Sequence, residues 1–152
     1  MNFRHLIGLG AGIFLMSSAM AGAPTPAQSV QARKANFNEM GAAMKAIGDE
    51  LRTNAPDMNA VRSAARDIAS RSGRIMDGFP KGSGPQPDLK TRARPEIWTQ
   101  RPDFLKLQQQ LTFAANDLVT ASAGSDQAAI ARARAEVGAV CKSCHERFRA
   151  SD

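Results

Sequence analysis

The amino-acid sequence predicts an all-α protein, folded as an antiparallel four-helix bundle. In four separate segments the apolar residues recur at spacings of three and four, which is the pattern of one buried helix face. No segment alternates apolar and polar residues with the period of two that a half-buried strand requires. Two short connections and one long connection join the four segments. Helices joined in this way pack beside their neighbours in a bundle.

The first predicted helix runs from Pro26 to about Asn54. Proline is favoured at the first helical position, and Pro56 stops the helix from continuing. Its apolar face repeats every seven residues, at Val30, Phe37, Met44 and Leu51. Asp57 is the expected N-cap of the second helix. The apolar face of that helix comprises Met58, Val61, Ala65, Ile68, Ser72, Ile75 and Phe79.

A long loop is predicted to follow the second helix. Residues 78–88 contain three glycines and three prolines, and a basic stretch at 90–95 continues the loop. Loops of this length within a compact domain are often functional.

The third helix is expected over residues 102–123, with Gly124 as its stop signal. Ser125 is the expected N-cap of the fourth helix, which covers about 126–149. The third apolar face comprises Phe104, Leu107, Leu111, Ala114, Leu118 and Ala121. The fourth comprises Ile130, Ala133, Val137, Val140, Cys144 and Phe148.

Residues 1–21 have the composition of a secretory signal peptide. A short basic start precedes an apolar, uncharged run, and Ala19-Met20-Ala21 forms a small-x-small cleavage pattern. We expect cleavage after Ala21, which leaves one domain at 22–152 in the periplasm with no membrane insertion. A retained anchor is the alternative, but the apolar run has about 15 residues and a spanning helix needs about 20.

The chain is basic, with a formal net charge of +6 that falls by one when Arg4 leaves with the signal peptide. Such a charge favours weak contact with an acidic partner surface. It does not indicate nucleic-acid binding, because the basic residues are scattered and aromatic residues make up only 5% of the chain.

The motif that carries most chemistry is Cys141-Lys142-Ser143-Cys144-His145, the C-x-x-C-H pattern for covalent attachment of one haem c. The chain has two cysteines and two histidines, and His5 lies in the predicted signal peptide. On a helix, positions i, i+3 and i+4 share one face. Cys141 and Cys144 are therefore placed to form two thioethers along one haem edge, with His145 directed toward the iron.

Other uses of these residues fit less well. A disulfide between helical cysteines three apart has poor geometry. A structural zinc site takes four ligands, so it would need a carboxylate in addition to these three side chains. A thioredoxin-like pair needs a βαβ unit, and a nucleophilic cysteine needs a separate histidine as base. A haem-free helical interaction protein would leave the motif unexplained.

The C-terminal position of the motif in a four-helix chain resembles the class II c-type cytochromes, the cytochrome c prime family, which is a known example of the up-down bundle. Three stretches carry the resemblance, which spans essentially the whole mature chain. They are 33–37 with 40–41, then 94–98, and finally 140–149, which is the most specific. The resemblance implies that Cys141 and Cys144 bind the haem vinyl carbons and that His145 is the proximal ligand.

The same resemblance implies further contacts. Arg149 would lie over the solvent-facing side of the His145 imidazole, Arg33 would approach a haem propionate, and Trp98 would pack near the haem. Phe37 would stand over the iron on the distal side. Low-spin members of that family have a methionine at this position as sixth ligand.

On periodicity alone Phe37 is a core residue, and solvation or core packing would equally account for Arg33 and Trp98. A phenyl ring cannot ligate iron, so Phe37 at the distal site would leave the iron five-coordinate. Met40, one helical turn away, is the alternative sixth ligand in a low-spin electron carrier. Core packing also explains Met40.

These features predict a haem protein that carries electrons, binds a small gas such as nitric oxide, or does both. An apolar distal side favours uncharged ligands and disfavours bound oxygen. The absence of a second histidine argues against peroxidase chemistry, so we do not expect an enzyme. The expected partners are a redox protein and a gaseous ligand. Members of the family often pair through their first two helices, which leaves a homodimer open.

Overall fold

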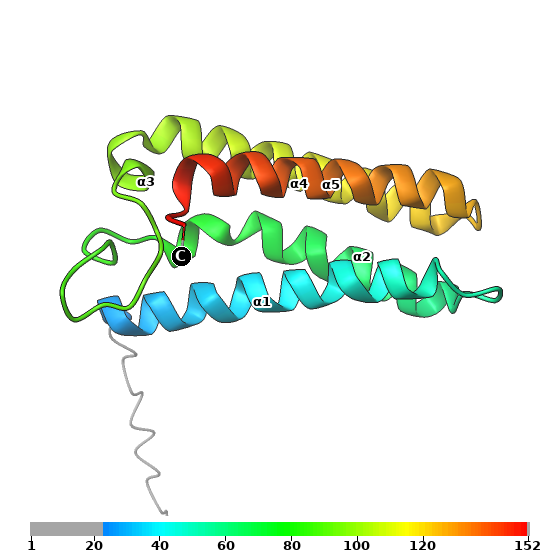
Figure 1. Ribbon diagram of the computed structural model, residues 1–152, viewed down its shortest axis with the longest axis horizontal. Coiled ribbons are helices and arrows are strands. Elements are labelled where there is room, and N and C mark those ends of the chain that lie inside the picture. The colour runs from blue at the N-terminus through cyan, green and yellow to red at the C-terminus, as the bar shows by residue number, and fades with distance from the viewer. Residues whose placement is uncertain (1–22, 152) are drawn as a thin grey trace, which may run out of the picture.

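The computed structural model describes residues 23–151, and the predicted signal peptide and its cleavage site lie outside them. Four long helices lie side by side: α1 (Pro26–Glu50), α2 (Met58–Gly73), α4 (Arg101–Ala123) and α5 (Gln127–Phe148). The 3-10 turn η1 (Ile75–Gly78) and the short helix α3 (Glu96–Thr99) lie at one end of the bundle (Figure 1). Residues 23–151 contain isolated β-bridges but no strand. The predicted fold class is confirmed.

Side-chain caps fix three of the four helix starts. Thr25 caps α1 through a capping box with Gln28, and Asp57 caps α2 as predicted. At α5 the expected cap, Ser125, is wrong. Asp126 occupies that place, and its carboxylate accepts from the backbone N–H groups of the second and third helical residues. A carboxylate is favoured over a serine hydroxyl at this position because its negative charge also interacts with the positive end of the helix dipole.

The first two helices are shorter than predicted. α1 ends at Glu50 rather than near residue 54, because the turn to α2 starts at once and Glu50 Oε2 accepts from the Asp57 backbone N–H. α2 ends at Gly73, where helix propensity is low. The chain then tightens into η1, which keeps Ile75 buried without continuing the α-helix.

The core is built by α2 against α1 and α4, and by α4 against α5, whereas α1 and α5 make little contact with each other. The fully buried aliphatic side chains are Ile47, Val61, Ile68, Ile97, Leu118, Ile130 and Val137. One bond joins α1 to α5: Arg134 Nε donates to the Met44 carbonyl at 2.8 Å. The Arg134 guanidinium lies close against Gly48, where an added Cβ would come within 2.7 Å of it.

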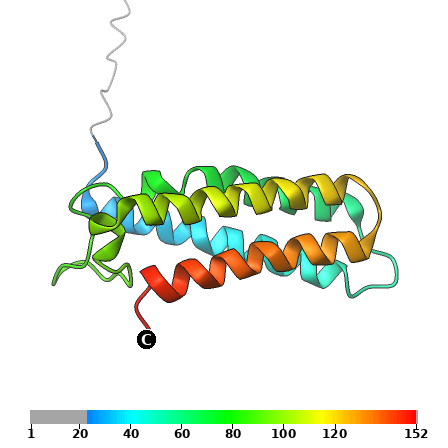
Figure 2. The same ribbon diagram turned by 90° about the horizontal axis from the view of Figure 1, so that it is seen from above.

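The long loop after η1 returns to the end of α5. The Arg94 N–H donates to the Phe148 carbonyl at 2.9 Å, and the Ala150 N–H donates to the Arg92 carbonyl at 2.8 Å. We call this pairing of residues 92–94 with 148–150 the C-terminal clasp. It lies at the end of the bundle that carries α3 (Figure 2). The clasp fixes the last turn of α5, which follows directly on the C-x-x-C-H motif.

Candidate functional site

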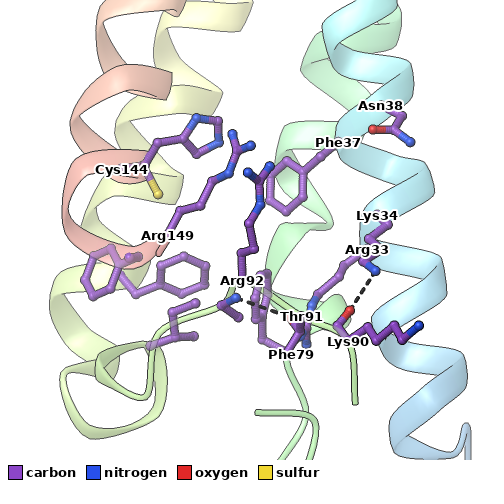
Figure 3. A pocket seen from close by; sticks show the side chains of 15 residues that line it. Arg33, Lys34, Phe37, Asn38, Phe79, Lys90, Thr91, Arg92, Cys144 and Arg149 are labelled. Carbon is purple, nitrogen blue, oxygen red and sulfur yellow. Dashed lines mark hydrogen bonds between the residues drawn. The ribbon is translucent and has the colours of Figure 1, made fainter. Parts of the chain in front are cut away.

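Two cavities lie between α1 and α5, where these helices do not pack on each other. Their volumes are about 730 and 260 Å³. The larger falls in the usual range for ligand sites. Four side chains line both cavities: Phe37, Phe104, Cys144 and His145. We call the two cavities together the α1–α5 crevice, and Figure 3 shows the side chains that line the larger one.

The α5 wall of the crevice carries the motif as the helical spacing predicts. Cys144 and His145 line both cavities, and Cys141 lines the smaller one. Burial raises the pKa of the Cys141 thiol. Burial, with a smaller contribution from Cys141, raises the pKa of Cys144 to about 11. Both thiols therefore stay protonated at neutral pH, which argues against a reactive thiolate.

His145 is held in the form that binds a metal. Desolvation by burial lowers the pKa of the imidazole, and the positive charge of Arg92 lowers it further. The neutral imidazole is therefore favoured at neutral pH, and its nitrogen lone pair is available to a metal. No group of three His, Cys, Asp or Glu side chains comes together as metal ligands within residues 23–151. The carboxylate that a zinc site would need does not join the motif there.

Phe37 faces His145 from the opposite wall. The two rings meet edge to face, with centroids 6.4 Å apart. Behind Phe37 a chain of edge-to-face aromatic pairs runs through Phe79 and Phe104 to Phe148, with centroid separations of 6.3, 5.0 and 5.2 Å. Such pairs stabilise by about 0.5–1.5 kcal/mol each beyond simple burial. These aromatic rings come from α1, the segment after η1, α4 and α5, and together they line the larger cavity.

Arg33 lies one turn before Phe37 and is only 5% exposed. Its Nη1 donates to the Ser83 carbonyl at 2.8 Å and to Ser83 Oγ at 3.0 Å, and Nη2 donates to Thr91 Oγ1 at 2.6 Å. The guanidinium also lies 4.7 Å from the Phe79 ring centroid. All these partners are uncharged, and desolvation lowers the pKa of Arg33. A buried cation with neutral partners that lines the larger cavity favours an anionic group there.

The open side of the larger cavity carries four exposed cations, Lys34, Lys90, Arg92 and Arg149. No carboxylate is among the described residues that line this cavity. The side chains of Arg92 and Arg149 extend into the space between Cys144 and Phe37 (Figure 3). Lys34 Nζ donates to the Lys90 carbonyl at 2.7 Å, which ties the loop to α1. We call Lys34, Lys90, Arg92 and Arg149 the cationic mouth.

The two remaining predicted site residues lie as follows. Arg149 is the C-cap of α5, with extended backbone, and it lines the larger cavity. Trp98 lines neither cavity. Its ring packs on Phe79 at a centroid distance of 5.9 Å, and its Nε1 donates to the Pro80 carbonyl at 3.0 Å. Trp98 therefore supports the crevice wall through Phe79. Phe79 was predicted to lie on the apolar face of the second helix, and it follows η1 instead.

The residues present fit a haem. Two thiols and one imidazole line the α5 wall, four aromatic rings line the larger cavity, and Arg33, a buried cation that lines the same cavity, could neutralise a carboxylate of the cofactor. Sequence reasoning missed Lys34, Lys90, Thr91 and Phe79 as lining residues. The basic stretch at 90–95 was the one signal that pointed to part of this set.

Comparison with known families decides the relationship. The family model for cytochrome c' matches residues 28–149 of this chain. The chain belongs to the cytochrome c' family. This family carries covalently bound haem c, and the two cysteines near the C-terminus of the chain fit its attachment motif. The resemblance inferred from the sequence is confirmed.

Individual members of the cytochrome c' family match over most of their length. Cytochrome c' of Allochromatium vinosum is 35% identical over 140 residues, which cover 90% of this chain and 89% of the relative. Cytochrome c-556 of Agrobacterium fabrum is 32% identical over 136 residues, covering 89% and 90%. The crystal structure of cytochrome c' from Thermochromatium tepidum superposes with a TM-score of 0.78 at 32% identity, covering 86% of this chain and all of that one.

Proposed function

We propose that this chain is a periplasmic haem protein that transfers electrons and binds small uncharged gases, such as nitric oxide, at an iron with no sixth ligand from the protein. One observation carries the proposal: Phe37 faces His145 across the α1–α5 crevice. A phenyl ring offers no lone pair, so a haem held by His145 would keep an open coordination position on the Phe37 side. Bound haem supplies an iron that changes oxidation state and accepts gaseous ligands.

The residues of the chain divide the remaining tasks. Cys141 and Cys144 would hold the haem covalently, so that it is not lost, and neutral His145 would be the proximal ligand. Arg33 would pair with a propionate while it holds the loop through Ser83 and Thr91. The smaller cavity, beside Phe37, is lined by apolar side chains apart from Gln108 and His145, which favours uncharged ligands there.

An enzymatic role finds no support in the lining of the crevice. As far as the described residues show, neither cavity carries a carboxylate or a histidine other than His145. General acid–base catalysis at a ligand on the Phe37 side would need such a group. We infer a binding and electron-transfer protein rather than an enzyme.

The alternative is a six-coordinate electron carrier with Met40 as sixth ligand. Met40 is buried and lines the smaller cavity beside Phe37. Its sulfur accepts a weak hydrogen bond from Asn36 Nδ2 at 3.9 Å. Phe37, not Met40, makes the ring contact with His145, which favours the open position.

Absorption spectroscopy tests the proposal. The purified reduced protein should show a five-coordinate, high-spin haem spectrum that changes when nitric oxide is added. A low-spin Met/His spectrum that becomes high-spin in Met40→Leu would overturn the open position and support Met40. A protein without a Soret band would remove both haem functions.

Export and self-association complete the proposal. The periplasmic location rests on the signal-like residues 1–21, and mass spectrometry of the mature protein should give an N-terminus at Gly22. Within residues 23–151, no helix is long and apolar enough to cross a membrane.

A solved cytochrome c' that is 30% identical has an unusual ligand-controlled dimer dissociation. We propose a homodimer here too, which sedimentation with and without nitric oxide would test.

A further inference from the structure

We propose that the cationic mouth, Lys34, Lys90, Arg92 and Arg149, is the docking surface for an acidic electron-transfer partner protein. The four side chains come from three separate parts of the chain: α1, the long loop and the end of α5. All four line the larger cavity, and Figure 3 shows Arg92 and Arg149 extending into the space beside Cys144, with Lys34 and Lys90 together at its α1 side. The inference rests on the proposed electron-transfer function.

The charge around this opening is far from balanced. With Arg33, the larger cavity is lined by five cationic side chains and by no described carboxylate. The two propionates of a haem would neutralise two of these five positive charges, and Arg33 is the buried one. Arg92 already interacts with another group. Of Lys34, Lys90 and Arg149, at most one would pair with the second propionate, so positive charge remains around the larger cavity. Fixed charge of one sign at a cleft raises the local concentration of the opposite charge and its rate of encounter.

The neighbouring sequence strengthens this surplus. The loop over residues 79–95 has four basic side chains and one acidic one, Asp88. Glu146, one residue after His145, pairs with Lys142 at 3.7 Å on the exposed side of α5. Asp103 pairs with Arg147, close to the end of α5. Glu146 and Asp103 are thus engaged in ion pairs. Neither of them lines the larger cavity, and nor does Asp88.

The position of the mouth suits electron transfer. Its cations border the same cavity that Cys144 and His145 line, so a partner bound there would lie next to the haem-binding wall. Exposed charges guide encounter and fix orientation more than they add affinity, and salt screens them. Such weak, salt-sensitive contact is typical of redox partners, whose interfaces are small. An acidic protein surface is therefore the occupant that this mouth fits.

The test measures oxidation of the ferrous protein by two small probes of opposite charge. The ferrous protein gives one electron to hexacyanoferrate(III), which becomes hexacyanoferrate(II), or to the cationic tris(phenanthroline)cobalt(III), which becomes the cobalt(II) complex. We expect the hexacyanoferrate rate to fall with salt and the cobalt rate to rise. In Lys34→Glu/Lys90→Glu the hexacyanoferrate rate should fall by about tenfold, because steering is lost.

The matched control is Arg66→Glu/Arg132→Glu, which changes net charge equally on exposed parts of α2 and α5 that line neither cavity. It should change the rate by less than about twofold at moderate salt. The milder Lys34→Gln/Lys90→Gln keeps the test valid if the reversed pair does not fold, and it should give an intermediate rate. Equal rates in the mouth variants and the control would overturn the proposal.

A polyanion separates protein docking from binding of small anions. Poly-L-glutamate should slow the hexacyanoferrate reaction of the parent protein and should have much less effect on Lys34→Glu/Lys90→Glu. If poly-L-glutamate has no effect on the parent, the mouth receives small anions only and the docking surface is refuted. Absorption spectra of the same samples report the haem and its coordination separately, so failure of the docking proposal is distinguishable from failure of the proposed haem function.

Discussion

At the scale of single residues, Phe37 has two roles that do not conflict. Its ring is the first in a row of aromatic pairs that runs from α1 to α5, and the same ring stands opposite His145. The helical repeat that places Phe37 on the buried face of α1 also directs it into the crevice. Core packing and, in the proposed function, an open coordination position on the haem iron would therefore be two consequences of one placement.

Replacing Phe37 by methionine should place a thioether opposite His145. We expect Phe37→Met to convert the haem spectrum from five-coordinate to six-coordinate low-spin, and to weaken nitric oxide binding by at least about tenfold through competition for the iron. Absorption spectroscopy and ligand titration would measure both effects. Phe113→Met is the control, because Phe113 is 71% exposed on α4. A Phe37→Met spectrum identical to that of the control would show that Phe37 does not face the iron.

Arg33 is expected to contribute to stability as well as to haem binding. Arg33→Met would leave Ser83 and Thr91 without their buried donor, and buried unpaired groups cost about 1–3 kcal/mol each. We therefore expect the free energy of unfolding to fall by about 2–4 kcal/mol in denaturant titrations. Arg66→Met, at an exposed site on α2, should stay within about 0.5 kcal/mol of the parent. A loss as small as that of the control would argue that the loop does not depend on Arg33.

At the scale of elements, the ends of the helices depend on single polar side chains that apolar periodicity does not report. The spacing of apolar residues predicted all four long helices. It did not predict that α2 stops at Gly73, because Ile75 and Phe79 remain buried after the chain has changed to a 3-10 turn. Residues stay buried on both sides of the point where the α-helix gives way to the 3-10 turn. The spacing of buried residues therefore cannot show where α2 ends.

The start of α5 allows the cap to be tested directly. Asp126→Ala should lower the free energy of unfolding by about 1 kcal/mol, because two backbone N–H groups lose their acceptor. Ser125→Ala is the matched control, since Ser125 was the cap expected from sequence but does not cap the helix in the structure. Its effect should stay within about 0.5 kcal/mol. If thermal or chemical unfolding showed a larger loss of stability in Ser125→Ala than in Asp126→Ala, Ser125 would be the cap.

At the scale of the whole molecule, the bundle is incomplete along one seam. α1 and α5 each pack on another helix but make little contact with each other, and Arg134 bridges them at the Met44 carbonyl. In the proposed function the haem would occupy the crevice along this seam, so it would take part in the core. Ligands that bind only the folded state stabilise it.

Loss of haem attachment should therefore destabilise the protein. We expect Cys141→Ala/Cys144→Ala to lower the thermal midpoint by about 10 °C or more, which corresponds to about 2–3 kcal/mol or more for a domain of this size. Its haem, where any is retained, should be extracted into acidified organic solvent. Ser143→Ala, between the two cysteines, should keep the haem bound to the polypeptide and the parent midpoint. Equal midpoints in both variants would show that haem does not support the seam.

The sequence was a good guide to the local part of the site and a poor guide to its distant part. Cys141, Cys144 and His145 lie within five residues, so helical spacing alone places them on one face. The cationic mouth joins Lys34 to Lys90 and Arg149, and only the loop that returns to α5 through the C-terminal clasp brings them together. The sequence left Trp98 open between packing near the haem and core packing, because the position of Phe79 against its ring is set by the same long-range folding.

The separation of the two walls along the chain has a consequence for biogenesis. Cys141, Cys144 and His145 lie in the last helix, and Phe37, which faces His145, lies in the first, so residues 37–145 must all be synthesised before both walls exist. A product that ends before Cys141 lacks both attachment cysteines. Covalent haem on the polypeptide would therefore report that translation has passed the motif.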